Sequence, residues 1–190
     1  MTATDQRAPD HRATDQLAGA DLFPMAPLIR GTLVSLYLAL VLPLPLLAPA
    51  AARPLLALAL VAGLVLVLAI TSERVRLDAD GLAVGLAPWC QPLLRRGWQL
   101  SWSDVQGLTP VATSQGGRVF YVRSRTGGAY LLPQRVARFP RFLERFEAAT
   151  GIGTAEVGRI SPPWTYQLLA LLAGLMLAGE LAAIVLLRPA

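Results

Sequence analysis

The stretch PLLALALVAGLVLVLAIT, residues 54–71, contains no charged side chain and a single polar one. Its length is close to the roughly 20 residues with which a helix, rising about 1.5 Å per residue, crosses a hydrocarbon core about 30 Å thick. Two further predominantly apolar runs occupy residues 28–47 and 164–187. The three runs predict three membrane-spanning helices, and so an integral membrane protein that contacts the bilayer directly.

The composition fits this prediction and argues against an enzyme. Of the 190 residues, 54% are hydrophobic, which is more than an ordinary soluble domain of this length contains. Cys90 is the only cysteine, so no internal disulfide can form, and His11 is the only histidine. A zinc site or a Cys–His nucleophile pair needs several such groups close together. We therefore predict no catalytic residue, no metal site and no cofactor.

The pattern of polarity divides the chain into four parts. Residues 1–27 carry four aspartates and two arginines and too little apolar area to order themselves, which predicts a disordered tail. A transmembrane helical hairpin, residues 28–71, follows. The polar, arginine-rich segment 72–161 is predicted to be a separate domain between the second and third spans. Residues 162–190 contain the third transmembrane helix.

A cleavable signal peptide is the alternative interpretation of the first apolar run. Pro43 and Pro45 interrupt that run, and small residues in A-x-A spacing precede Arg53. However, the region before the run is long and not basic, and another apolar run follows at once. A helical hairpin that turns at residues 49–54 is the better account, with Pro54 near the start of the second helix, where its missing N–H does no harm.

The arginines near the ends of the spans predict the orientation. On one side lie Arg30, Arg74, Arg76 and Arg159; on the other lie Arg53 and Arg188. The positive-inside bias therefore places the N-terminus and the middle domain in the cytoplasm, and the hairpin tip and C-terminus outside. The sequence leaves open whether the membrane is a plasma membrane or a thylakoid membrane.

The middle domain begins with a pattern typical of β-hairpins. Val75 and Leu77 alternate with charges, and Asp78–Gly81 predicts a turn rather than a calcium loop, because the further oxygen ligands of such a loop are absent. Shorter segments that alternate or are rich in β-branched and aromatic residues follow with short connections, at 98–102, 105–111, 119–122 and 130–132. We expect about six or seven strands in an antiparallel sheet or a partly closed barrel.

An amphipathic helix is predicted after the strands. Phe139, Phe142, Leu143 and Phe146 recur at helical spacing, and Gly151 is expected to end the helix. The aromatic face is expected to pack on the sheet as core. The predicted fold is thus three transmembrane helices plus an antiparallel β domain capped by one C-terminal helix.

These elements resemble the bacterial pleckstrin-homology-like membrane proteins. The resemblance lies in the hairpin Leu77–Leu82, the strand entry Leu100–Val105 and the exit Leu131–Pro133 before the helix. It implies a PH-like domain used for interaction and transfers no catalytic residues. The layout also resembles the photosystem I assembly factor of cyanobacteria and plastids, which has an N-terminal helical hairpin before a similar β domain. The third span and the long tail depart from that layout.

Basic side chains dominate the middle domain, with 12 arginines against 7 acidic residues in 72–161. Their clusters are predicted to contact anionic lipid headgroups or an acidic protein partner, or to form a solvated face. Nucleic acid is not expected, because the domain is tethered to the bilayer at both ends. The candidate interaction surface consists of Arg95, Arg96, Arg138, Arg141 and Arg145.

Two features stand out in the third span. Small residues recur every four positions, so that another helix can approach closely, and packing against the protein's own first two helices is the favoured interpretation. This helix-packing stripe consists of Ala170, Gly174, Ala178 and Ala182. Glu180 is the only acid inside a span and is expected to pair with Arg53 or Arg188 near the outer interface.

Taken together, the sequence predicts a non-enzymatic membrane protein whose cytoplasmic domain docks an unidentified membrane-protein partner or supports assembly of a membrane complex. Two alternatives remain open. One is a sensor that binds anionic lipid through its arginines. The other is an accessory subunit of a transporter or channel, for which Glu180 is the indication.

Overall fold

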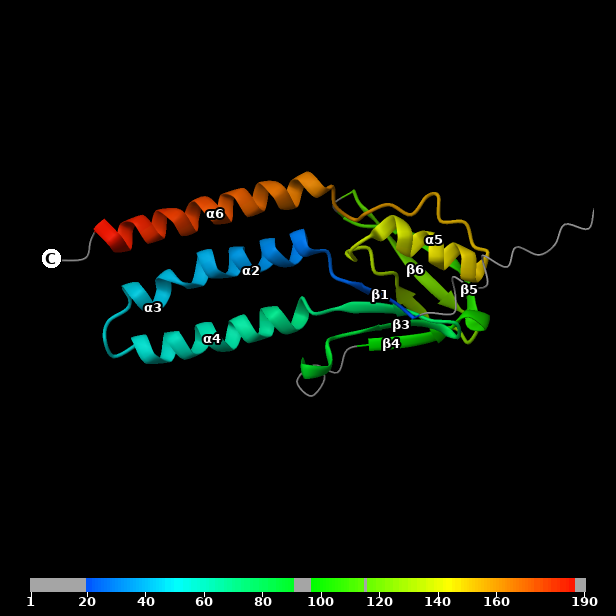
Figure 1. Cartoon of the computed structure of the whole chain (residues 1–190), viewed down its shortest axis with the longest axis horizontal. Coiled ribbons are helices and arrows are strands. Elements are labelled where there is room, and N and C mark those ends of the chain that lie inside the picture. Colours follow the sequence, from blue (N-terminus) through cyan, green and yellow to red (C-terminus); the bar gives the residue numbers. More distant parts are fainter. Residues whose placement is uncertain (1–19, 91–96, 115, 187–190) are drawn as a thin grey trace, which may run out of the picture.

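The computed structural model describes residues 20–90, 97–114 and 116–186. Long helices occupy one end of the molecule and two β-sheets with a shorter helix occupy the other (Figure 1). The arrangement confirms the predicted combination of membrane-length helices with an antiparallel β domain.

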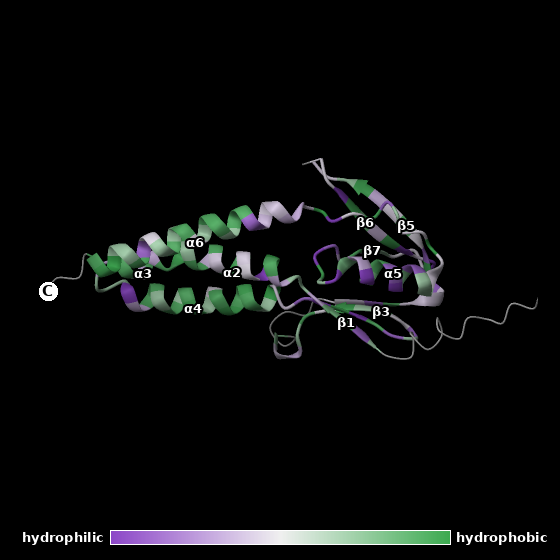
Figure 2. Cartoon of the chain, turned by 45° about the horizontal axis from the view of Figure 1, so that its top comes forward, coloured by the Kyte–Doolittle hydropathy of each residue, from purple (hydrophilic) through white to green (hydrophobic). Residues whose placement is uncertain are grey.

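Within the described ranges, three helical segments are long and apolar enough to cross a membrane: Pro27–Leu47, Arg53–Ile70 and Pro163–Leu186. The first is divided into α2 (Pro27–Val41) and α3 (Pro43–Leu47), and the others are α4 (Arg53–Ile70) and α6 (Pro163–Leu186). Most of their residues are hydrophobic (Figure 2). The division at Leu42 follows from Pro43 and Pro45, which lack the N–H groups that continue a helix.

The three spans form a row with α2 in the middle and α4 and α6 on either side (Figures 1 and 2). Polar groups of α2 bond to both neighbours. Thr32 Oγ1 donates to the carbonyl oxygen of Tyr166 in α6 at 3.1 Å, and Tyr37 Oη donates to that of Leu60 in α4 at 2.8 Å. A Cβ at Gly63 would collide with the Tyr37 hydroxyl, so a glycine is needed for this approach. In a bilayer such groups require a protein partner, because water is absent.

The described residues of the β domain form two open antiparallel sheets. The first has the order β1-β2-β3-β4, formed by Asp21–Pro24, Arg74–Leu77, Gly81–Gly85 and Gly97–Ser101. The second has the order β5-β6-β7, formed by Val105–Ala112, Arg118–Ser124 and Ala129–Leu131. Short 3-10 helices, Pro88–Cys90 and Trp102–Asp104, lie on either side of β4. The sheets do not close into a barrel, so the expected partly closed barrel is not supported.

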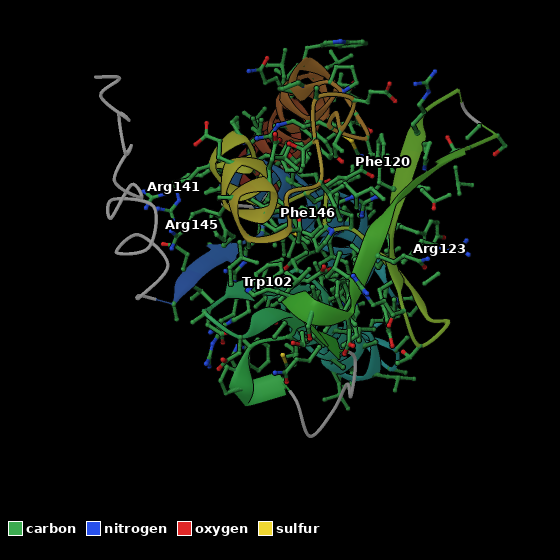
Figure 3. The ribbon with its side chains drawn as sticks, turned by 90° about the vertical axis from the view of Figure 1, so that its right-hand side faces the viewer. Trp102, Phe120, Arg123, Arg141, Arg145 and Phe146 are labelled. Carbon is green, nitrogen blue, oxygen red and sulfur yellow. The ribbon has the colours of Figure 1, made fainter. Side chains whose placement is uncertain are left out.

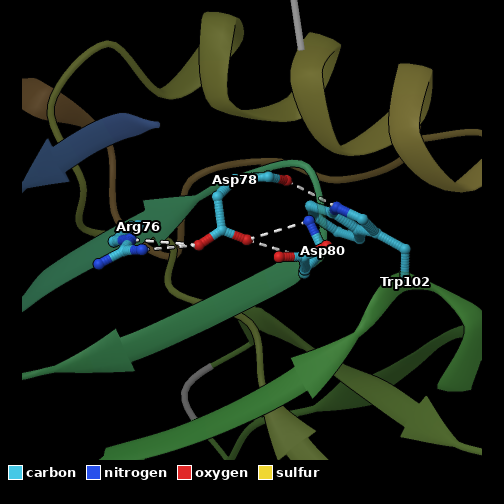
Figure 4. Close-up of polar contacts among 5 residues, drawn as sticks. Arg76, Asp78, Asp80 and Trp102 are labelled. Carbon is cyan, nitrogen blue, oxygen red and sulfur yellow. Dashed lines mark hydrogen bonds and ion pairs between the residues drawn. The ribbon is translucent and has the colours of Figure 1, made fainter. Parts of the chain in front are cut away.

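The turn between β2 and β3 is held by Asp78, as the hairpin prediction required. Its Oδ1 accepts the backbone N–H groups of Asp80 and Gly81 at 3.2 and 3.0 Å, and its Oδ2 pairs with Arg76 at 3.1 Å (Figure 4). Trp102 Nε1 donates to the Asp78 carbonyl oxygen at 2.9 Å. The carboxylate thus closes an Asx turn that anchors the first sheet to the chain entering the second.

One boundary predicted from the sequence needs correction. The disordered tail was expected to reach residue 27, but Asp21–Pro24 form β1, which pairs with β2 in the register Phe23↔Val75. Residues 1–19 of the predicted tail lie outside the described residues. The four residues of β1 are too few to show the alternation typical of a strand. They are ordered by pairing with β2, which follows two membrane spans in the sequence.

The hydrophobic core lies between the sheets and α5 (Phe139–Thr150). Phe142 and Phe146 are fully buried, as predicted from the helical spacing. Phe142 meets Phe23 of β1 edge-on with ring centroids 5.6 Å apart, and Phe146 meets Trp102 at 6.0 Å. The helix ends at Gly151, whose φ of 70° suits glycine. At about 25 cal/mol per Å² of apolar area, such rings contribute much of the domain's stability.

Strand β1 is also held to α5 by a largely buried ion pair. Arg145 Nε lies 2.7 Å from Asp21 Oδ2, and the two side chains are 13% and 21% exposed. Arg141 approaches the same aspartate at 3.7 Å but is 56% exposed. Water screens the second contact more than the first, so Arg145 provides most of the attraction.

The end of α4 is tied to the first sheet through a small polar cluster. Ser72 Oγ accepts the N–H of Ala87 at 3.1 Å and lies 3.0 Å from the buried sulfur of Cys90. Next to it, burial raises the pKa of the Glu73 carboxyl above its usual value of 4.5, and the nearby Arg135 guanidinium opposes this shift. Folding therefore favours the protonated form of Glu73.

We predict that removal of one partner of the Asp21–Arg145 pair frees β1. Arg145→Gln and Asp21→Asn are each expected to destabilise the domain by about 1–3 kcal/mol, because the remaining charge stays partly buried. The double variant should be no worse than the singles. Two measurements test this: hydrogen exchange of the β1 amides, and thermal unfolding in detergent. Unfolding is monitored by the reactivity of the Cys90 thiol, which is buried in the folded protein. Arg141→Gln is the matched control and should change stability by less than about 0.5 kcal/mol; strictly additive losses would contradict the pairing.

We also predict that Glu73 makes stability depend on pH. Because its pKa is raised on folding, the folded protein binds more protons than the unfolded chain at pH values just above 4.5, so stability falls as pH rises through that range. Glu73→Gln should raise the unfolding temperature at pH 7 and flatten this dependence. Glu144→Gln, which removes an exposed carboxylate of α5, should do neither. An unaltered pH profile in Glu73→Gln would disprove the assignment.

Candidate functional site at the membrane junction

The membrane helices and the β domain meet where three chain segments converge. These are the start of α2, the segment 134–138 before α5, and the segment 159–166 that leads into α6. Ala26 N donates to Arg135 O at 2.8 Å, and Ala137 N donates to Pro24 O at 2.8 Å. The backbone between β1 and α2 is thus fixed against the entry to α5.

The segment before α6 is held by two further polar contacts. Gln134 is buried, and its Nε2 donates to Gly158 O at 2.7 Å and to Arg118 O at 3.2 Å. The Glu147 carboxylate accepts the N–H and the hydroxyl of Thr154 at 3.1 and 2.7 Å, and these hydrogen bonds lower the pKa of Glu147 below its usual value. These contacts place the chain that carries Arg159 at the junction.

A cavity of about 470 Å³ opens between the three segments. Apolar side chains of the first turns of α2 and α6 line one part, including Leu28, Ile29 and Tyr166. Three arginines, Arg135, Arg138 and Arg159, line the other part. We refer to this as the junction cavity. Its size lies within the range of about 300–1,000 Å³ that is usual for small-ligand sites.

Two of the arginines are held in place by contacts within the domain. Arg138 Nη2 donates to Leu22 O at 3.0 Å, and its guanidinium lies 5.4 Å from the centre of the Phe23 ring. Among the described residues, Arg138 is the only one other than glycine with a positive φ, 51°. The Arg159 guanidinium lies 5.4 Å from the centre of the Phe139 ring. Contacts of this kind limit the freedom of long cationic side chains.

The predicted arginine surface is divided by the structure. Arg138, Arg141 and Arg145 all contact β1, and Figure 3 shows Arg141 and Arg145 beside that strand. Arg95 and Arg96 lie outside the described residues. These three arginines therefore have intramolecular contacts, whereas their role as a surface for partners stays a prediction.

Glu180 and Arg53 are not brought together. Glu180 Oε2 is buried without a hydrogen-bond partner among the described residues, and Arg53 Nε donates to Ala48 O at 3.0 Å. The reason is the row of spans: Arg53 begins α4, Glu180 belongs to α6, and the first span, α2 with α3, lies between these helices. The other partner considered, Arg188, lies outside the described residues.

The helix-packing stripe of α6 faces α2 only in part. Ala173, which is fully buried, lies at the contact between α6 and the rest of the protein, and Ala170 is half-buried. The remaining members, Gly174, Ala178 and Ala182, are exposed, and a Cβ at Gly174 would meet nothing within 4 Å. Packing against the protein's own helices, the favoured interpretation of the stripe, therefore fails for three of its four residues.

Sequence reasoning did not identify the junction cavity. Arg159 was used only to assign orientation, and Arg135 was one of many arginines. Only Arg159 offered a signal, because it lies just before the third span in the sequence, whereas Arg135 reaches the cavity through the fold alone. Among the described residues, no group of three or more His, Cys, Asp or Glu side chains is placed to hold a metal ion.

Comparison with known proteins gives one informative similarity. No known protein-family profile matches the sequence, and no solved structure shows a significant match. The uncharacterized protein slr0269 of Synechocystis sp. is 44% identical over 173 residues, which cover 88% of this chain and 87% of that protein. The similarity extends over nearly the full length of both proteins. The chain therefore belongs to the same family as the Synechocystis protein.

Proposed function

We propose that this chain is a non-enzymatic membrane protein that docks a partner protein within the membrane and supports assembly of a membrane complex. The observation that carries the proposal is the uncovered side of α6. This helix packs against α2 through the face that contains Ala173, while Gly174, Ala178 and Ala182 stay open. Small side chains at this spacing allow a second helix to approach closely, which maximises van der Waals contact between helices in lipid.

The arrangement of the spans adds to this argument. A row of three helices leaves more helix surface uncovered than a closed bundle would, and α4 and α6 lie on its two outer sides. Tyr37 and Thr32 fix the positions of α4 and α6 against α2. A partner therefore meets a preformed surface, which reduces the entropy lost on association.

The β domain offers a second surface for docking. The outer side of β5-β6-β7 carries the neighbours Thr109, Tyr121 and Leu131, and Leu131 is 50% exposed. Arg123 extends from this sheet away from the core (Figure 3). An apolar patch bordered by a cation on an uncovered sheet is typical of protein contact sites. The four-stranded and three-stranded sheets with one closing helix also favour the PH-like resemblance, and with it an interaction module.

The two alternatives have different support. The exposed arginines favour an anionic-lipid sensor, and the unpartnered carboxylate of Glu180 favours an accessory role in transport. A docking role takes precedence here, because three of the four stripe residues of α6 are exposed and so accessible to a partner helix. The arginine bias further favours a cytoplasmic location for the β domain.

We predict that a bulky side chain in the stripe blocks docking. A photo-crosslinking residue at Ala178 should give a discrete adduct with one membrane protein in native membranes, and Gly174→Leu should abolish it. Gly179→Leu is the matched control. A Cβ built at Gly179 also meets nothing within 4 Å, but it points about 140° around the helix from a Cβ at Gly174. The adduct should persist in the control. Loss of the adduct in both variants, or in neither, would refute docking through the stripe.

The proposed orientation predicts a labelling pattern. In a Cys90→Ser background, a cysteine at Ala51 in the hairpin tip should react with an impermeant thiol reagent added outside intact cells, whereas a cysteine at Gly127 in the β domain should react only after permeabilisation. Both positions are exposed, so access and not burial decides the result. The opposite pattern would reverse the topology.

A further inference from the structure

We infer that the junction cavity is a binding site for the headgroup of an anionic phospholipid. This inference does not depend on the docking function of α6. It rests on the position, the charge and the lining of the cavity.

The position places the cavity at the depth of lipid phosphates. Its walls include the first turns of α2 and α6, which begin at Pro27 and Pro163 and run into the apolar spans. Where such helices leave the hydrocarbon core, they meet the polar headgroup layer on either side of it. A lipid beside α2 and α6 therefore presents its phosphate to the cavity without leaving the bilayer.

The charge of the cavity suits an anion. Arg135, Arg138 and Arg159 line it, and among the described residues none of the three is within ion-pair distance of a carboxylate. Glu73 acts on Arg135 electrostatically but does not line this cavity. The first residues of helix α2 line the cavity and this helix has no side-chain cap, so the positive end of its dipole adds to the positive potential there. Basic pockets between membrane helices are a recurrent form of headgroup site.

The lining favours a lipid over a free anion. Beside the arginines lie Leu28, Ile29 and Tyr166, which offer apolar surface continuous with the helix faces. This surface suits the glycerol backbone and the first methylenes of the acyl chains, whereas a free phosphate gains nothing from it. The guanidinium groups of Arg138 and Arg159 are held over the rings of Phe23 and Phe139, so part of the entropy of ordering them is already lost.

The test uses the full chain purified in a neutral detergent. Short-chain phosphatidylglycerol, short-chain phosphatidylcholine and inorganic phosphate are titrated separately, and bound species are counted by native mass spectrometry. We expect saturable binding of phosphatidylglycerol, with at least about tenfold weaker binding of the zwitterionic lipid and of phosphate, because only the anionic lipid uses both parts of the lining.

The variant Arg135→Gln/Arg159→Gln should weaken phosphatidylglycerol binding about tenfold or more, because two charged donors are lost. Arg123→Gln/Arg125→Gln removes the same charge from the end of β6 and the turn that follows it, and is the matched control. Its binding is expected to stay within about twofold of the parent. Arg135→Lys/Arg159→Lys should restore part of the affinity. The unfolding temperatures of the parent and all variants, measured by the reactivity of the buried Cys90 thiol, should be equal, so that only folded proteins are compared.

Three results would overturn the inference. Equal binding of the two lipids would show that the headgroup charge is not recognised. Equal weakening in both glutamine variants would show that the net charge of the domain, and not the cavity, attracts the lipid. Inorganic phosphate that binds as tightly as phosphatidylglycerol would identify a soluble anion as the occupant.

Discussion

The pairing of β1 with β2 is the constraint on which the rest of the structure depends. Strand β1 lies before the first span and β2 follows the second, yet Phe23 and Val75 are direct partners in the ladder. The membrane hairpin is therefore inserted between two neighbouring strands of one sheet. The hairpin leaves and re-enters the sheet at the same end of these two strands, where Pro24 pairs with Arg74. Helix α2 therefore begins close to where α4 ends.

This constraint also builds the junction. Because β1 is fixed on the sheet, the backbone after it can bond to the residue before β2 on one side and to the entry of α5 on the other. Met25 N donates to Glu73 O at 3.0 Å, and Ala26 N donates to Arg135 O at 2.8 Å. The first turn of α2 then starts at a defined height above the core. Movement of the helices relative to the domain would break these buried backbone bonds, each of which is costly to leave unpaired.

The proposed functions use two different surfaces of this frame. The open side of α6 lies within the spans and offers van der Waals contact to a helix. The junction cavity lies at their base and offers charge. Both surfaces include residues of α6, the cavity at its first turn and the stripe further along the helix.

The sequence by itself determined the elements whose patterns are local. Apolar length predicted the three spans, Asp78–Gly81 predicted the hairpin turn, and the spacing of Phe139, Phe142 and Phe146 predicted the buried face of α5. These predictions held because hydrophobic burial and turn chemistry act within a few residues.

Only the tertiary structure decided what depends on distant segments. It placed Asp21–Pro24 in a strand, it directed Arg138, Arg141 and Arg145 to β1, and it separated Glu180 from Arg53 by inserting α2. It also brought Arg135 and Arg159 to one cavity. In each case the outcome depends on which residues meet across long stretches of chain. Such contacts leave no periodic pattern in the sequence, because periodicity reports which face of an element is buried and not what covers it.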